Sequence, residues 1–135
     1  MGESLTHINL VNAIKEWISN HEEENNLCIY SDLPTSHYGG KPPSINGYYP
    51  DIYATVRGNK KIFIGEAKTA NDIESRHSRQ QFQAFLQYCI PHSNSELIIA
   101  VPWDFVNCAR GLIQSLIRRN ETKTVSVRIL ERLSY

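Results

Sequence analysis

The chain has 135 residues, of which 41% are hydrophobic and 21% are charged, and its formal net charge is zero. These values are typical of a single domain over residues 1–135, since two domains would need a longer chain. No stretch reaches the roughly 20 apolar residues that cross a bilayer. No signal peptide is visible at the N-terminus, so we expect a cytoplasmic protein with no membrane partner. The strongly basic composition of many nucleic-acid-binding domains is absent.

The charges are unevenly distributed along this neutral chain. Residues 1–32 carry one basic residue against six acidic ones, whereas residues 110–132 carry six basic residues against two acidic ones. Such a polarised surface could offer one basic face to phosphates, although solvated helix faces explain the same pattern. The cysteines are odd in number and far apart, so we expect buried free thiols in a reducing compartment rather than disulfides or a zinc site. They are Cys28, Cys89 and Cys108.

Hydrophobic periodicity predicts the secondary structure in chain order. Helical spacing of apolar residues predicts a helix over 4–20, with Ser4 as its N-cap. A short strand over 27–30 follows, and prolines and glycines then predict a loop over 34–49. The remaining elements are strands over 51–57 and 60–68, a helix over 75–89, a buried strand over 96–101, a helix over 104–120 and a strand over 124–130. The order α-β-β-β-α-β-α-β predicts an α/β fold with a central mixed β-sheet flanked by helices.

The segment 50–68, PDIYATVRGNKKIFIGEAK, contains the candidate chemistry. Gly58-Asn59 suits a two-residue hairpin turn, and pairing outward from that turn places Asp51 directly opposite Glu66. Side chains alternate along a strand, so Glu66 and Lys68 share a face. Two carboxylates this close repel each other, and we expect a divalent cation between them. Mg²⁺ fits, because it takes one or two carboxylates together with waters and phosphates. The competing interpretation is an ion triad that only stabilises the hairpin.

Pro50-Asp51, followed after a hairpin by Glu66-Ala67-Lys68, resembles the signature of the PD-(D/E)xK nuclease superfamily, which includes restriction endonucleases and Holliday junction resolvases. The resemblance implies a restriction endonuclease-like core over most of the chain. It implies that Asp51 and Glu66 are ligands of Mg²⁺, or of Mn²⁺ as a substitute, and that Lys68 is the catalytic lysine. The implied activity is a DNA endonuclease that hydrolyses phosphodiester bonds and leaves a 5′-phosphate.

Members of this superfamily often add an acidic residue from the first helix. Alignment with resolvase-like nucleases places His7 at that position, with Glu16 and Glu3 as other candidates for an accessory role. A histidine on a helix face, without a role in the site, is the alternative for His7. Some branches carry a glutamine and a tyrosine on the next helix, and Gln81 with Phe85 matches half of that pattern.

Several further residues are candidates for contacts with DNA. Arg76 and Arg79 on the 75–89 helix, and Lys41 in the 34–49 loop, could hold phosphates, although solvated surface explains the two arginines equally well. Tyr48 and Tyr49 in the same loop suit contact with unstacked bases. Packing of these tyrosines over the rim of the core explains them equally well.

The leading functional hypothesis is thus a metal-dependent DNA endonuclease. The alternatives are a catalytically inactive nucleic-acid-binding or assembly module with the same fold, and an interaction domain whose triad is only structural. The sequence is compatible with a branched junction, a specific duplex site, nicked or single-stranded DNA, or RNA as the substrate. Relatives of this size commonly act as dimers, so we expect a homodimer. Its apolar contact would come from the 105–117 helix or from the last strand, which ends in Leu133 and Tyr135.

Overall fold

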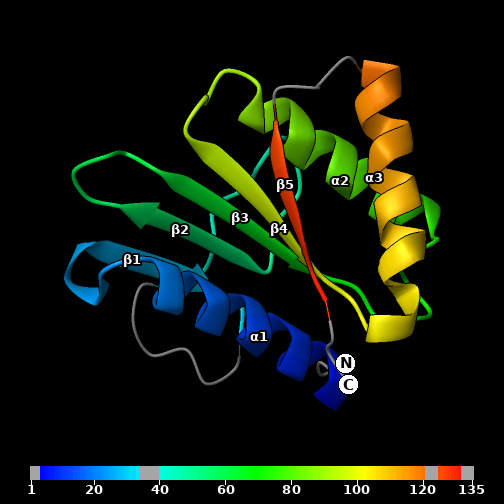
Figure 1. The fold of residues 1–135 in the computed structure, drawn as a ribbon, viewed down its shortest axis with the longest axis horizontal. Coiled ribbons are helices and arrows are strands. Elements are labelled where there is room, and N and C mark those ends of the chain that lie inside the picture. The colour runs from blue at the N-terminus through cyan, green and yellow to red at the C-terminus, as the bar shows by residue number, and fades with distance from the viewer. Residues whose placement is uncertain (1–3, 34–39, 121–124, 132–135) are drawn as a thin grey trace.

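The computed structural model describes residues 4–33, 40–120 and 125–131. Its elements are α1 (Leu5–His21), the 3-10 helix η1 (Glu24–Asn26), β1 (Leu27–Ser31), β2 (Ile52–Val56), β3 (Ile62–Ala67), α2 (Arg76–Cys89), β4 (Ser95–Ala100), the 3-10 helix η2 (Trp103–Phe105), α3 (Val106–Asn120) and β5 (Ser126–Leu130). The predicted α/β class, with a mixed sheet flanked by helices, is confirmed (Figure 1).

The sheet has five strands in the order β1-β2-β3-β4-β5. The first three form an antiparallel meander, while β4 pairs parallel to β3 and β5 pairs parallel to β4. Parallel neighbours require a crossover connection, and α2 and α3 supply the two crossovers. The carboxyl ends of β3, β4 and β5 therefore lie at the same edge of the sheet.

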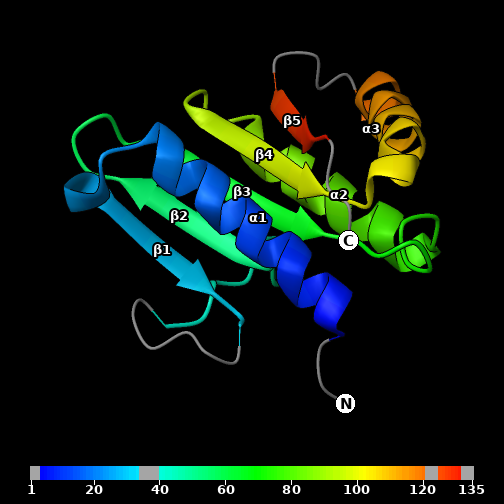
Figure 2. The ribbon, with the colours of Figure 1, turned by 60° about the horizontal axis from the view of Figure 1, so that its bottom comes forward.

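Helices cover both faces of this sheet (Figure 2). α1 packs on one face through Leu10, Val11, Ile14 and Ile18, all of which are buried. α2 and α3 pack on the other face. β4 lies between the two layers, and each of its residues is buried, as its continuous apolar run predicts. The predicted N-cap of α1 is confirmed, since the side chain of Ser4 accepts a backbone hydrogen bond at the start of this helix. Ser75 caps the start of α2 in the same way.

The β2–β3 hairpin has the predicted register but a different turn. Ile52 pairs with Gly65 and Tyr53 with Ile64, so the register extends to Asp51 opposite Glu66. The strands are shorter than predicted, and the turn occupies the residues between Val56 and Lys61. The N–H of Arg57 donates to the carbonyl of Asn26, 2.7 Å away, instead of pairing across the hairpin. The prediction of a two-residue Gly58-Asn59 turn is therefore wrong.

A two-residue turn of that kind occurs instead at Asn46-Gly47. Both residues have positive φ, 50° and 92°, as a type I′ turn requires. Ile45 and Tyr48 exchange both backbone hydrogen bonds across the turn. The amide of Asn46 donates to the carbonyl of Ala84 in α2, 3.0 Å away. The described part of the predicted 34–49 loop, from residue 40 onward, is thus fixed to α2, whereas residues 34–39 lie outside the described ranges.

The structure corrects the prediction for the cysteines. All three are free, but only Cys89 is buried, whereas Cys28 is exposed and Cys108 is partly exposed. Cys28 lies on the edge strand β1 and takes the outward position between two apolar neighbours. Within the described ranges, no helix combines the length and apolar character needed to cross a bilayer.

Candidate active site

An open cleft of about 800 Å³ lies at the carboxyl ends of β3 and β4. Five segments line it: the start of α1, the residues just before β2, the end of β3 with the turn that follows, α2 at Gln81, and the connection from β4 into α3. The N–H of Lys68 donates to the carbonyl of Ala100, 3.0 Å away, which joins the ends of the two strands. Clefts at the carboxyl ends of parallel strands are the usual ligand sites of open α/β sheets.

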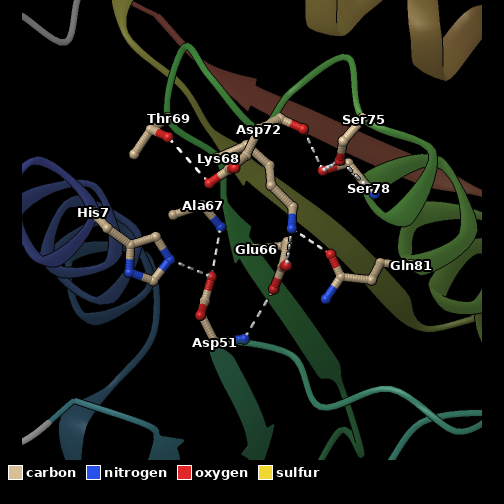
Figure 3. A network of polar contacts seen from close by, with 10 residues as sticks. All are labelled: His7, Asp51, Glu66, Ala67, Lys68, Thr69, Asp72, Ser75, Ser78 and Gln81. Atoms are coloured by element: carbon tan, nitrogen blue, oxygen red, sulfur yellow. Dashed lines mark hydrogen bonds and ion pairs between the residues drawn. The ribbon is translucent and has the colours of Figure 1, made fainter. Parts of the chain in front are cut away.

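The three predicted catalytic residues meet in this cleft (Figure 3). The N–H of Asp51 donates to Oε1 of Glu66 at 3.1 Å, and Oδ2 of Asp51 accepts from the N–H of Ala67 at 2.9 Å. Nζ of Lys68 lies 3.0 Å from Oε2 of Glu66. These contacts bring together both carboxylates and the ammonium, as the hairpin register predicts.

Glu66 is the most deeply buried charged group of the site, with 3% of its surface exposed. The pKa of Glu66 is raised from its ordinary value of 4.5 to about 8, chiefly by burial and secondly by the neighbouring carboxylate of Asp51. Lys68 acts in the opposite direction but does not offset these two effects. The cluster therefore favours binding a proton or another cation at this carboxyl.

Gln81, from the middle of α2, completes the surroundings of Lys68. Its Oε1 accepts a hydrogen bond from Nζ of Lys68, and both side chains are buried. The ammonium is thus held between a carboxylate and an amide oxygen, which fixes its position at the cleft. Of the predicted accessory residues, Gln81 is one that the fold brings to the site.

His7, in the first turn of α1, is the second predicted accessory residue that the fold brings to the site. Its Nε2 lies 3.2 Å from Oδ2 of Asp51 (Figure 3), and its backbone N–H donates to the capping hydroxyl of Ser4 at 3.1 Å. The carboxylate of Asp51 is thus held both by α1, through His7, and by the end of β3, through the N–H of Ala67. The start of α1 also faces the cleft, where the helix dipole favours negative charge.

Glu16 does not reach the site. It is about half a helical turn out of phase with His7, because an α-helix has 3.6 residues per turn. Its side chain lies instead in a separate groove with Trp17 and Arg128. The prediction of an accessory role for Glu16 is therefore not supported by its position, and Glu3 lies outside the described ranges.

The three predicted phosphate-binding cations also lie away from the cleft lining. Lys41 is exposed and approaches Asp32, with Nζ 3.8 Å from Oδ1. Arg79 lines a groove between α2 and α3, and Arg76 is exposed at the start of α2. Their predicted contacts with DNA would require a substrate that extends well beyond the cleft.

The cleft also contains acidic residues that the sequence interpretation did not select. Asp72 lies in the turn after Lys68, where its Oδ2 accepts from the hydroxyl of Thr69 at 3.2 Å. Asp104 lies just after β4. The signal that could have identified both is their place directly after strands whose carboxyl ends share one edge.

A hard divalent cation fits the donors at this site. Within the part of the chain that the structure describes, no three His, Cys, Asp or Glu side chains form a group able to enclose a metal ion. Mg²⁺ does not need such a group, since it keeps several waters and binds through one or two carboxylates and substrate phosphates. Oδ1 of Asp51 accepts no hydrogen bond from the described residues, and Glu66 has an excess of nearby negative charge.

Comparisons of the chain with protein-family models, with curated proteins and with solved structures find no match in any of the three. The residues of the cleft and their geometry are therefore the basis for assigning a function.

Proposed function

We propose that the protein is a metal-dependent DNA endonuclease with a restriction endonuclease-like core, and that Asp51, Glu66 and Lys68 form its active site. The observation that carries the proposal is the convergence of two carboxylates and one ammonium in an open cleft at the strand ends. The segment order and the Pro50-Asp51…Glu66-Ala67-Lys68 pattern support the same assignment.

A second buried glutamate gives a useful comparison with Glu66. Glu96, at the start of β4, is 6% exposed. It contacts two cations, with Nε of Arg128 at 2.9 Å and Nζ of Lys61 at 3.6 Å. Glu66 has one cationic partner, Lys68, and a second carboxylate beside it. The negative charge of Glu96 is therefore fully compensated by cations, as in a structural ion-pair cluster, whereas the arrangement at Glu66 opposes stability unless a cation is bound.

Asp51 and Glu66 would hold the metal ion. When bound, Mg²⁺ supplies charge stabilisation at the scissile phosphate and lowers the pKa of an attacking water. In the reaction, the water oxygen bonds to phosphorus and gives up a proton to solvent. The bond from phosphorus to the 3′ oxygen breaks, and this oxygen takes up a proton from solvent, which leaves a 3′-hydroxyl and a 5′-phosphate. Lys68, held by Glu66 and Gln81, orients the water and offsets negative charge that develops on the phosphorane. His7 keeps the carboxylate of Asp51 in place.

Titration with Mg²⁺ and Mn²⁺ separates this proposal from its two alternatives. For a nuclease we expect calorimetric metal binding that is lost in Asp51→Asn and retained in Glu16→Gln, together with DNA cleavage in the same metals. An inactive nucleic-acid-binding or assembly module would bind DNA without cleaving it. An interaction domain with a structural triad would neither bind metal nor cleave, and that result would overturn the proposal.

A further inference from the structure

Exposed large apolar side chains occur in three of the segments that line the candidate active site. Among the described residues, four such side chains are exposed: Leu5, Tyr49, Ile90 and Trp103. Tyr49 lines the cleft directly, Leu5 lies between two residues that line it, and Trp103 lies between Pro102 and Asp104, which also line it. Ile90 is the exception, at the end of α2 and near the start of β4. Exposed apolar groups that collect at one site usually mark a binding surface.

The fold holds Tyr49 toward the cleft. The Asn46-Gly47 turn is anchored to α2, and the ring of the preceding residue, Tyr48, packs edge-on against His77 with ring centroids 5.7 Å apart. Tyr49 lines the cleft instead and is 67% exposed. Of the two tyrosines that the sequence selected, one thus packs on α2 and the other is available to a ligand.

Trp103 is presented by a short, well-anchored turn. The N–H of Phe105 donates to the carbonyl of Pro102 at 2.9 Å, and the ring of Phe105 packs against the core. Trp103 is left 64% exposed. Trp103 lines a groove of its own, separate from the cleft, together with Val106 and Arg110. An exposed indole on a fixed turn loses little side-chain entropy when a flat ligand stacks on it.

The charges of the cleft do not suit a grip on duplex phosphates. The described lining contains four carboxylates, those of Asp51, Glu66, Asp72 and Asp104, against the side chains of Lys68 and His7. Affinity for duplex DNA comes chiefly from several lysine or arginine contacts to phosphates. Aromatic stacking instead recognises the faces of bases, which a paired duplex keeps covered by neighbouring base pairs.

We propose that the cleft takes unpaired nucleotides, and that Tyr49 and Trp103 stack on bases on either side of the scissile phosphate. The substrates are then single strands, or the unpaired segments of flaps, gaps and branched structures. This inference rests on the proposed nuclease function and names its substrate class.

The test uses the intact chain, first in EDTA and then with Ca²⁺, an oxygen-liganded cation. The probes are an oligothymidylate of roughly 12 nucleotides, within the usual site sizes for single strands, and a blunt duplex of the same length. Anisotropy gives the affinity. Tryptophan fluorescence reports stacking on Trp103, since Trp17 already stacks on His21 at a centroid distance of 3.9 Å.

We expect the single strand to bind at least about tenfold more tightly than the duplex and to quench the fluorescence. Trp103→Ala and Tyr49→Ala should each weaken binding by roughly 5- to 100-fold, the usual range for loss of one base–aromatic stack. Trp103→Phe should restore most of the affinity but lose the quenching, and the matched exposed-apolar control Ile90→Ala should bind normally.

Equal affinity for the duplex, or normal binding by both alanine variants, would overturn the inference. The inference would also fail if Trp103→Ala changed the oligomeric state in light scattering without changing affinity, because a second copy would then cover this surface.

Cleavage assays in Mg²⁺ distinguish failure of this inference from failure of the nuclease proposal. Duplex cleavage that is unaffected by the alanine variants leaves the nuclease proposal intact and overturns this one. Preference for single strands without any cleavage overturns the nuclease proposal alone.

Discussion

Glu66 links the electrostatics of the cleft to the stability of the whole protein. The pKa of this carboxyl is raised from 4.5 to about 8 by burial and by Asp51, so the folded protein holds a proton that the unfolded chain releases at neutral pH. A raised acid pKa contributes stability that is complete below pH 4.5 and is lost as the pH rises to 8. Without metal, we therefore expect the free energy of unfolding to fall by a few kcal/mol between about pH 5 and pH 8. Urea unfolding at a series of pH values measures this change.

Glu66→Gln is the control for the pH prediction. The variant carries no titrating group at this position, so its stability should change much less over the same pH range. Mg²⁺ competes with the proton for the carboxylate, and its stabilising effect on the wild type should grow as the pH rises. A wild-type protein that becomes more stable from pH 5 to pH 8 in EDTA would contradict the assigned electrostatics.

The residues of the triad could be predicted because their proximity is local. Asp51, Glu66 and Lys68 lie on one hairpin, where strand register and alternation decide which side chains meet. The contacts made by His7 and Gln81 depend on how two helices dock on the sheet, which no local pattern specifies. For the same reason, the sequence alone does not show that Glu16 points away from the site. Its direction follows only when the face of α1 that packs on the sheet is known.

At the scale of single elements, Gly65 determines how closely α1 approaches β3. A Cβ at this position would lie 2.8 Å from Cγ2 of Ile14 and 3.1 Å from Cβ of Ile52. Gly65→Ala should therefore destabilise the protein by roughly 1–3 kcal/mol, the usual cost of overpacking a core. Denaturant unfolding measures the loss.

Gly111, inside α3, is the matched control. A Cβ there meets no atom within 4 Å, so Gly111→Ala should stabilise by about 0.5–1 kcal/mol through helix propensity. If Gly65→Ala were as stable as Gly111→Ala, the close packing of α1 on the sheet would be wrong.

The strands and helices themselves follow hydrophobic periodicity closely, whereas the turns do not. Asn46-Gly47 is a strong type I′ signal, but prolines and glycines around it indicate an irregular loop. Next to Gly58-Asn59, the N–H of Arg57 donates to the carbonyl of Asn26, the last residue of η1, and this tertiary contact accompanies a wider turn. Local turn chemistry is thus overridden by a contact with the segment just before β1.

At the scale of the whole molecule, the sequence predicts the class of fold but not its surfaces. Which helix covers which face, and which loops meet at the cleft, follow from the crossovers and not from any one segment. The apolar side of α3 illustrates this. Val106, Ala109, Ile113 and Leu116 are buried in the core, so this face is not available for the dimer contact expected from it. Leu133 and Tyr135 lie outside the described ranges.

The homodimer remains a prediction, and it applies if the protein cuts both strands of a duplex. One active site cuts one strand, so cleavage of both strands at symmetric positions calls for two sites related by a two-fold axis. Cutting an unpaired strand needs a single site. If both strands of a duplex are cut, we expect light scattering to give a dimer on DNA. A monomer both free and bound, together with double-strand cleavage, would contradict the prediction.

Cleavage of end-labelled DNA is the decisive experiment for the nuclease proposal. The panel contains a single strand, a blunt duplex, a flap and a four-way junction, each incubated with Mg²⁺, Mn²⁺ or EDTA. The account predicts products with 5′-phosphates in either metal and none in EDTA. Asp51→Asn, Glu66→Gln and Lys68→Ala should each lower the rate by about 100-fold or more, while Glu16→Gln should cut like the wild type. No cleavage of any substrate, or an undiminished rate in Asp51→Asn, would contradict the account.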